Sequence, residues 1–200
     1  MRKSIVAVSV IAVAATFGIA AAATARLDRG ADAAPPAPEA AAETSLDDAT
    51  IVAIFDAANT ADIETGRLAA ERGASKEVRE FGVMLQRDHQ QVRQLGRDLA
   101  AKLGVVPTPP KDDQGAKDHA AAMKRLRALE GSAFDHAFLR HEAAFHAAVI
   151  DAVNTTLLPA IRNAELKSLV EKVAPAFHGH MVAAQNLERK LAGGSGSLGK

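Results

Sequence analysis

The sequence predicts an all-α protein: an antiparallel four-helix bundle with an extra short helix between helices two and three. Apolar residues recur at helical spacing along four long stretches, and no stretch alternates as a half-buried strand would. Hydrophobic residues make up 48% of the 200 residues, yet Trp and Tyr are absent and only 7 Phe occur. Abundant Ala and Leu with few aromatic residues favour closely packed helices. The length is sufficient for one well-packed domain.

The first 25 residues have the organisation of a secretory signal peptide. Arg2 and Lys3 precede an apolar run, which ends in small residues of the type found at cleavage sites, Ala23-Thr24-Ala25. The alternative is an uncleaved membrane anchor, because the apolar run is nearly long enough to span a bilayer. Both interpretations predict an exported protein that is periplasmic or associated with the outer envelope. We expect contact with the membrane only through this segment, if it remains uncleaved.

Two further segments lack the large apolar side chains that a folded core requires. Residues 26–45 are rich in Ala, Pro and charge, so we expect a disordered linker. Residues 193–200 form a Gly/Ser-rich tail that we expect to be flexible. The folded bundle is therefore predicted for residues 46–192.

Capping and breaking residues mark the first two helices. Ser45 is the predicted N-cap of helix one, whose apolar stripe spans Ile51–Leu68 before Gly73 ends the helix. Ser75 is the predicted N-cap of helix two, and Gly104 is its predicted end. A Pro-rich loop follows, which separates this helix from the next.

The second half of the chain shows similar signals. A short helix is predicted at about residues 117–130, and the segment Ser132–Asp135 resembles a capping box at the start of helix three. Helix three is predicted to end near Pro159. Asn163 is the predicted N-cap of helix four, and Pro175 is expected to kink that helix.

Charge and composition exclude several function classes. The chain has 24 basic and 24 acidic residues, so its formal net charge of zero gives no indication of nucleic-acid binding. The absence of Cys excludes disulfides, thiolate metal sites and a cysteine nucleophile. No nucleophilic-serine or phosphate-binding glycine motif is found either. The sequence therefore favours a non-catalytic protein over an enzyme, and it identifies neither a partner nor an oligomeric state.

Three of the seven histidines fall on the buried faces of three different helices. With a turn of about 100° per residue, His89, His146 and His180 each lie on the apolar stripe of their helix, near its middle. Imidazoles that converge in a bundle core are typical ligands of transition metals. We therefore predict one metal site with these three ligands, in envelope or stress physiology. Glu64, at the margin of the stripe of helix one, is the predicted fourth ligand.

Asp88 and Glu142 lean inward beside these histidines, so they are predicted supporting residues that orient the imidazole rings. The same acids permit an alternative interpretation. In it, the histidines form only a structural polar network inside a non-catalytic structural or interaction module of the cell envelope. The remaining histidines considered are predicted to lie at the surface or to point away from the core (His119, His136 and His178).

Short motifs also follow one another in a characteristic order along about residues 47–190. They include Glu64-Thr65-Gly66, Asp88-His89, Phe134-Asp135, His146, Pro175 and His180. In this order the motifs resemble those of a bacterial family, domain of unknown function 4142. The resemblance implies an exported protein with a ferritin-like four-helix fold, and it specifies no reaction.

Ferritin-like bundles suggest a di-iron carboxylate site, but the residues of this chain disfavour one. Such sites place a Glu three residues before each of two metal-binding histidines. The positions three residues before the inward histidines carry Gln86, Ala143 and Phe177. The expected cofactor, if the metal interpretation holds, is therefore a single zinc, copper or iron ion held mainly by imidazole nitrogens.

Overall fold

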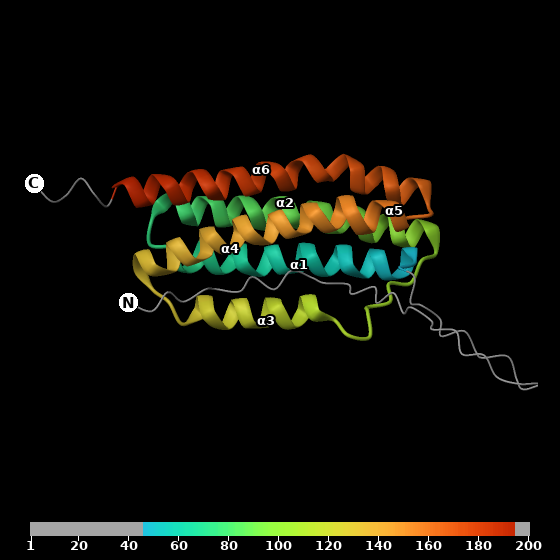
Figure 1. The fold of residues 1–200 in the computed structure, drawn as a ribbon, viewed down its shortest axis with the longest axis horizontal. Coiled ribbons are helices and arrows are strands. Elements are labelled where there is room, and N and C mark those ends of the chain that lie inside the picture. Colours follow the sequence, from blue (N-terminus) through green and yellow to red (C-terminus); the bar gives the residue numbers. More distant parts are fainter. Residues whose placement is uncertain (1–45, 195–200) are drawn as a thin grey trace, which may run out of the picture. The chain divides into compact units, whose positions relative to one another are not determined.

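The structure, a computed structural model, describes residues 46–194, and every element in this range is helical (Figure 1). The predicted all-α class is thereby confirmed. The predicted signal peptide (1–25) and linker (26–45) lie outside the described residues, as do residues 195–200 of the predicted tail. The elements are α1 (Asp48–Arg72), α2 (Lys76–Leu103), α3 (Gln114–Arg127), α4 (Gly131–Ala152), a π-helical turn (Val153–Leu157), α5 (Leu158–Ala160) and α6 (Ala164–Gly194).

The caps of α1 and α2 largely follow the predicted signals. Asp47, rather than the predicted Ser45, is the N-cap of α1, because its carboxylate accepts a hydrogen bond from the Thr50 amide at 2.7 Å. Ser75 is the N-cap of α2, as predicted, and its hydroxyl accepts from the amide of Val78. Gly104 ends α2 in the left-handed conformation with φ of 66°, which glycine adopts at little cost.

The predicted capping box at Ser132–Asp135 is wrong. Helix α4 begins after Glu130, whose side chain makes no capping hydrogen bond. The carboxylate of Asp135 instead reaches the connection between α1 and α2, where it accepts from the amides of Ala74 and Ser75 at 2.8 Å each. Helical phase explains the difference, because Asp135 is buried and faces the neighbouring helices rather than the start of its own.

The other boundaries differ from the prediction by a few residues. Helix α3 begins and ends three residues earlier than expected, with Asp113 as its N-cap. Asn163 caps α6, as predicted, by accepting from the amides of Glu165 and Leu166. Helix α6 continues through Pro175 and reaches Gly194, two residues into the predicted tail.

The long helices associate mainly in two pairs. Helix α1 packs chiefly on α2, and α4 packs chiefly on α6. Gly66 and Gly82 allow α1 and α2 to approach closely: a Cβ on Gly82 would lie 2.5 Å from the carbonyl oxygen of Gly66 and 2.7 Å from the amide nitrogen of Ala70. No side chain larger than hydrogen fits at this crossing without a shift of the backbone.

The buried apolar residues form two clusters that share no residue. Helices α1, α2 and α6 contribute to both, whereas α4 contributes to the second and the π-helical turn after it contributes to the first. The first cluster contains Ile51, Val52, Phe55, Ala100, Val153, Leu157, Ile161, Leu166, Val170, Val173 and Phe177. The second contains Leu68, Ala69, Val78, Phe81, Leu85, Met123, Leu126, Phe134, Phe138, Leu139 and Ala184. On α1, α2 and α6, and between α4 and the π-helical turn, an interval of sequence separates the members of the two clusters.

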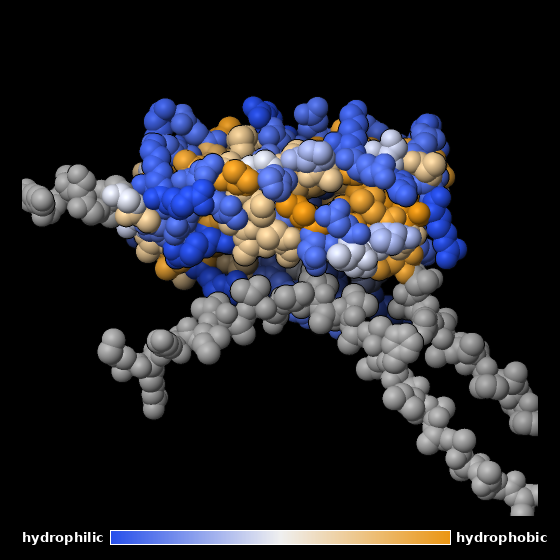
Figure 2. Space-filling view, turned by 45° about the horizontal axis from the view of Figure 1, so that its top comes forward, coloured by the Kyte–Doolittle hydropathy of each residue, from blue (hydrophilic) through white to orange (hydrophobic). Residues whose placement is uncertain are grey.

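The surface of the described part carries both polar and apolar side chains. On the face drawn in Figure 2, hydrophobic surface lies open between groups of hydrophilic side chains. Val83, Leu95 and Val106 are the large apolar residues with the most exposure in the described range. None of the helices within residues 46–194 combines the length and the apolar character that crossing a bilayer requires.

Candidate metal centre

A layer of buried polar side chains occupies the interval between the two apolar clusters. All four long helices contribute to it, and its members are 0–6% exposed. They are Asn59 and Asp62 from α1, His89 from α2, Glu142 and His146 from α4, and His180 from α6. Burying so many polar groups in one place is costly unless each finds a partner, so the contacts of each group decide what the layer can do.

The ring of His89 is held by Asn59. The amide nitrogen of Asn59 donates to the carbonyl oxygen of Phe55 at 2.8 Å, which turns its amide oxygen toward Nδ1 of His89, 3.0 Å away. An amide oxygen only accepts, so Nδ1 of His89 carries the proton. Its other nitrogen, Nε2, therefore holds a lone pair, and it faces Nδ1 of His180 at 3.2 Å.

His180 is oriented from its outer side by Asp88. Nε2 of His180 lies 3.2 Å from a carboxylate oxygen of Asp88, so this nitrogen is the natural donor and Nδ1 is left with a lone pair. The second oxygen of Asp88 accepts from Nε of Arg87 at 2.7 Å. The lone pairs of His89 and His180 thus face each other across 3.2 Å, an arrangement that is repulsive without a shared proton or cation.

His146 shows the same division of roles between its two nitrogens. Nδ1 donates to the backbone carbonyl oxygen of Glu142 at 2.9 Å. Nε2 is buried and has no hydrogen-bond partner, and the nearest carboxylate oxygen, on Asp62, is 3.9 Å away. Each of the three imidazoles therefore has one nitrogen oriented by an oxygen acceptor and a second nitrogen directed into the layer. Metal-binding histidines have this arrangement.

Ring nitrogens of the three histidines converge closely enough for one cation. One nitrogen from each of His89, His146 and His180 lies within 4.8 Å of the other two. A second set, formed by Asp62, Glu142 and His146, meets the same limit. The two sets share His146, so the histidine triad and the carboxyl pair adjoin each other inside one layer.

The carboxyl groups of Asp62 and Glu142 are the most poorly satisfied groups in the described part of the chain. Both side chains are buried, and none of their four oxygens has a hydrogen-bond partner by geometry. The two carboxyl groups and Thr65 are nevertheless close enough to affect the pKa of Glu142 through hydrogen bonding, as when the two carboxyl groups share a proton. The closest ring nitrogens are Nδ1 of His89, 3.4 Å from Asp62, and Nδ1 of His146, 3.6 Å from Glu142. Buried carboxylates without partners are strongly destabilising, so this pair requires either protons or a nearby cation.

Burial shifts the pKa values of both types of group toward their neutral forms. Burial lowers the pKa of His89 to about 2, helped by the neighbouring His146 and His180. Burial also lowers the pKa of His146 to about 4 and that of His180. Conversely, burial raises the pKa of Glu142 to about 7, and burial together with Glu142 raises the pKa of Asp62 well above its ordinary value. At neutral pH the imidazoles are therefore neutral, which is the form that binds metals.

The structure brings together most of the residues predicted from the sequence. His89, His146 and His180 meet in the layer, Glu142 lies beside His146, and Asp88 contacts His180 from the outside. Of the two predicted supporting residues, Asp88 is the one nearer to solvent. Its side chain is 29% exposed, whereas Glu142 is buried.

Glu64, the predicted fourth ligand, lies outside the layer. Its carboxylate contacts Nε2 of His119 on α3 at 2.8 Å, and 42% of its side chain is exposed. His119 and His136 are less solvated than predicted, since each contacts a glutamate; the partner of His136 is Glu188, at 3.4 Å. His178 is exposed, in agreement with its predicted direction.

Sequence reasoning missed Asp62 and the role of Asn59. The signal was present, because Asn59 and Asp62 follow Phe55 by four and seven residues and so share its buried face. Glu64 is two residues beyond Asp62, which turns it away from that face. Ala58 and Ala61 also follow Ile51 at helical spacing, and the stripe that they define carries Glu64 at its margin.

The fold and the layer together define a class: an all-helical protein with a buried histidine and carboxyl cluster at the middle of its long helices. Residues 33–187 match the family described as "Domain of unknown function (DUF4142)", and the chain belongs to this family. Comparison with curated proteins found no match.

A solved structure supports the helical fold. The chain is similar to a crystal structure of a DUF305 fragment from Deinococcus radiodurans, with a TM-score of 0.62 and 16% sequence identity. The similarity covers 71% of this chain and 95% of the other chain. At this identity the comparison concerns the fold alone.

Proposed function

We propose that this protein binds one transition-metal ion through Nε2 of His89, Nε2 of His146 and Nδ1 of His180. The observation that carries the proposal is the orientation of the three rings. Each has its outer nitrogen bonded to an oxygen acceptor, and the inner nitrogens converge in a layer that contains unpartnered carboxyl oxygens. Zinc, copper and iron ions all accept imidazole ligands.

The spacing of the inner nitrogens suits such an ion. Nε2 of His89 and Nδ1 of His180 are 3.2 Å apart. If each lay about 2.0–2.1 Å from a zinc ion, the N–Zn–N angle would be about 100°. This angle is close to tetrahedral, so Nε2 of His89 and Nδ1 of His180 are spaced for ligation of one ion. Binding would thus replace a repulsive contact with two coordinate bonds.

Asp62 and Glu142 supply the charge that a buried cation requires. Three neutral imidazoles leave a divalent ion with two uncompensated charges, and the adjoining carboxyl pair carries up to two negative charges. In this proposal Asp62, rather than the predicted Glu64, is the carboxylate that helix α1 contributes beside the ion. The mixed nitrogen and carboxylate environment, without thiolates, favours borderline divalent ions over soft monovalent copper.

The alternative function is a structural or interaction module in which the layer is only a polar network. The contact between His89 and Asn59, together with that between His180 and Asp88, favours this reading. It leaves Nε2 of His146 and the four carboxyl oxygens without partners, however, and a complete network would satisfy them. We propose binding rather than catalysis in either case, because the ring nitrogens are enclosed and offer no access to a substrate.

Metal analysis of protein purified without an affinity tag tests the proposal. After reconstitution with Zn²⁺, Cu²⁺ or Fe²⁺ in turn, we expect about one equivalent of bound metal in the wild type. The His178→Ala variant is the matched control, because this exposed histidine lies on the same helix as His180. Replacing all three inward histidines by Ala should abolish binding. Less than about a tenth of an equivalent in reconstituted wild type would refute the metal site.

We also propose that the four long helices form an antiparallel bundle of the ferritin-like type. Two contacts between α2 and α6 support it: Glu77 lies 2.8 Å from Lys190, and Lys102 contacts Glu165. Residue numbers on α2 rise as those on α6 fall, as expected for antiparallel neighbours. Distances between paired spin labels placed at both ends of α2 and α6 would test this arrangement.

The proposed cellular location follows from the first 25 residues, which have the features of a secretory signal peptide. We propose that the protein is exported to the periplasm or the outer envelope, with residues 26–45 as a linker. Mass spectrometry of the protein from fractionated cells tests this proposal. A mature chain that begins near residue 26 in the periplasmic fraction would support it, and an uncleaved cytoplasmic protein would contradict it.

A further inference from the structure

The polar layer lies at the junction between two helix pairs. Helix α1 packs chiefly on α2, and α4 packs chiefly on α6, while the contacts between the pairs are fewer. His89 belongs to the first pair, whereas His146 and His180 belong to the second. The histidine triad is therefore divided between the two pairs, one ligand on one side and two on the other.

Polar contacts join the pairs in this layer, beside one apolar contact in which Phe177 of α6 packs on the ring of His89. His89 faces His180 at 3.2 Å, and Asp62 faces His146 at 3.9 Å. The apolar clusters lie above and below this layer along the helices. Without a cation the junction has facing lone pairs and unpartnered carboxyl groups, so it contributes little to holding the pairs together.

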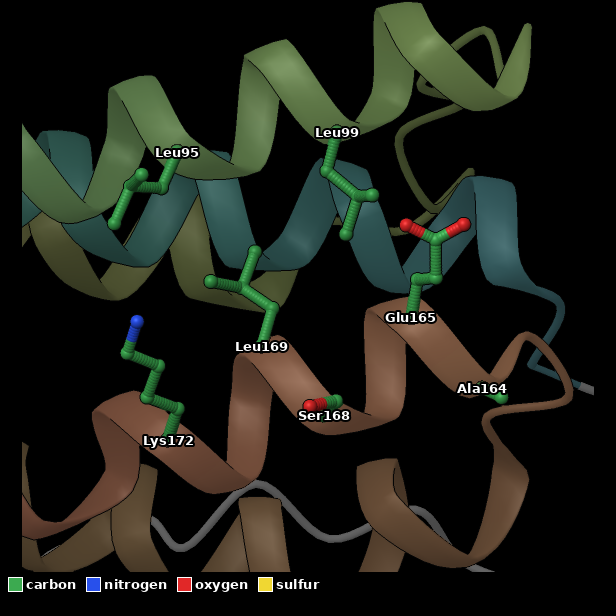
Figure 3. A pocket seen from close by; sticks show the side chains of 7 residues that line it. All are labelled: Leu95, Leu99, Ala164, Glu165, Ser168, Leu169 and Lys172. Atoms are coloured by element: carbon green, nitrogen blue, oxygen red, sulfur yellow. The ribbon is translucent and has the colours of Figure 1, made fainter.

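The contact between α2 and α6, which we call the seam, is hollowed at the surface. Leu95 and Leu99 of α2 lie opposite Leu169 of α6 (Figure 3). Asp88 is seven residues before Leu95, so it falls on the same face of α2. A surface hollow of about 410 Å³ lies here. Ion pairs cross the seam at its ends, between Glu77 and Lys190 and between Lys102 and Glu165. These exposed pairs are weak restraints.

We propose that the bound metal ion is a clasp between the two helix pairs: the α2–α6 seam parts to admit the ion, and coordination by both pairs then locks the seam. This inference rests on the proposed metal site. The ligand nitrogens are enclosed in the closed structure, so an ion reaches them only when the pairs separate. Asp88, the partly exposed carboxylate at this seam, is the first negative group that an entering cation meets.

Crosslinking across the seam tests the clasp. The chain has no cysteine, so Glu77→Cys with Lys190→Cys provides a unique pair for a short bismaleimide. The probe is Co²⁺, whose visible absorption reports its coordination. We expect the crosslink to slow Co²⁺ loading at least about tenfold, since opening becomes limiting, while the final occupancy stays unchanged.

A crosslink within one pair is the matched control. Nη2 of Arg97 on α2 donates to Oδ2 of Asp56 on α1 at 2.9 Å at the surface, so Asp56→Cys with Arg97→Cys joins helices that the proposal keeps together. This protein should load Co²⁺ within about twofold of the rate before crosslinking. Each double variant before crosslinking serves as its own folding control by circular dichroism.

The outcomes separate the clasp from the site itself. Full occupancy with equal loading rates for the two crosslinked proteins would overturn the clasp and leave the metal site standing. Absence of Co²⁺ binding in every form, including the wild type, would overturn the metal site and the clasp with it. Slow loading of the seam-crosslinked protein alone supports the clasp.

Discussion

Asn59 holds the ring of His89 in one tautomer. Its amide oxygen accepts from Nδ1 of His89 at 3.0 Å, and the carbonyl oxygen of Phe55 fixes the direction of the amide group. The lone pair on Nε2 of His89 is thereby presented to the layer before any ion arrives. Asn59 has no place in the ligand set, yet it determines which nitrogen is available.

Replacing Asn59 with Ala should weaken metal binding about 10–100-fold, because the ring loses the partner that orients it. The wild-type protein and the variant would be compared by Zn²⁺ titration against a competing chelator. Thr60→Ala is the control, since Thr60 bonds to Asp56 and Arg93 outside the layer. Unchanged affinity in Asn59→Ala would show that the ring keeps its orientation without the amide.

Metal affinity should depend on pH through the carboxyl groups rather than the histidines. The pKa of Glu142 is raised to about 7 by burial, so below this pH an entering cation must displace a proton. We expect the affinity to fall about tenfold for each pH unit below about 7. The pKa values of His89 and His146, about 2 and 4, leave both rings deprotonated throughout this range. In Glu142→Gln the slope near pH 7 should decrease; an unchanged slope would assign the proton to another group.

The stability of the metal-free protein should change with pH in the opposite direction. A carboxyl group whose pKa is higher in the folded than in the unfolded state stabilises the fold at low pH, and this contribution is lost as pH rises through about 7. The histidines, whose pKa values are lowered, lose their contribution only below about pH 6.5. Urea unfolding in chelator should therefore show a decreasing free energy of unfolding between about pH 6.5 and 7.5. Glu142→Gln should flatten this decrease.

The close crossing of α1 and α2 predicts a large effect for Gly82→Ala. The added Cβ would meet backbone atoms of Gly66 and Ala70 at 2.5 and 2.7 Å, which cannot move independently of the helix. We expect the free energy of unfolding to fall by about 2 kcal/mol or more, despite the better helix propensity of Ala. Gly179→Ala on α6 is the control, because its Cβ would meet no atom within 4 Å. That change should be neutral or stabilising by up to about 1 kcal/mol in thermal or urea unfolding.

Asp135 and Asp48 make equivalent connections at opposite positions in the fold, so they form a matched pair of variants. Asp135 accepts from the amides of Ala74 and Ser75, and Asp48 accepts from those of Arg162 and Asn163. Asp135 is buried, whereas Asp48 is partly exposed. We expect Asp135→Ala to lower the free energy of unfolding by about 2–3 kcal/mol and Asp48→Ala by about 1 kcal/mol. Equal losses in urea unfolding would show that burial does not set the strength of these bonds.

Helical periodicity was sufficient to predict the helices and the three inward histidines. His89, His146 and His180 each follow the apolar stripe of their helix, and the stripe faces the core. Periodicity does not specify which residues of different helices reach the same height, since that depends on how the helices cross. This is why Glu64 rather than Asp62 was predicted as a ligand. For the same reason, periodicity did not predict that Asp135 accepts a hydrogen bond from the amide of Ser75, 60 residues earlier in the chain.

The polar layer also determines the register in which the long helices pack against one another. The apolar clusters on either side are built from Leu, Val, Ile and Phe, which tolerate a different partner of similar size. The layer does not, because its contacts require particular polar partners: an amide for one imidazole, and a carboxylate for another. Sliding one helix by a single turn, about 5.4 Å, would leave carboxyl and imidazole groups against leucine. The same residues that we propose to bind a cation therefore set the vertical register of the fold.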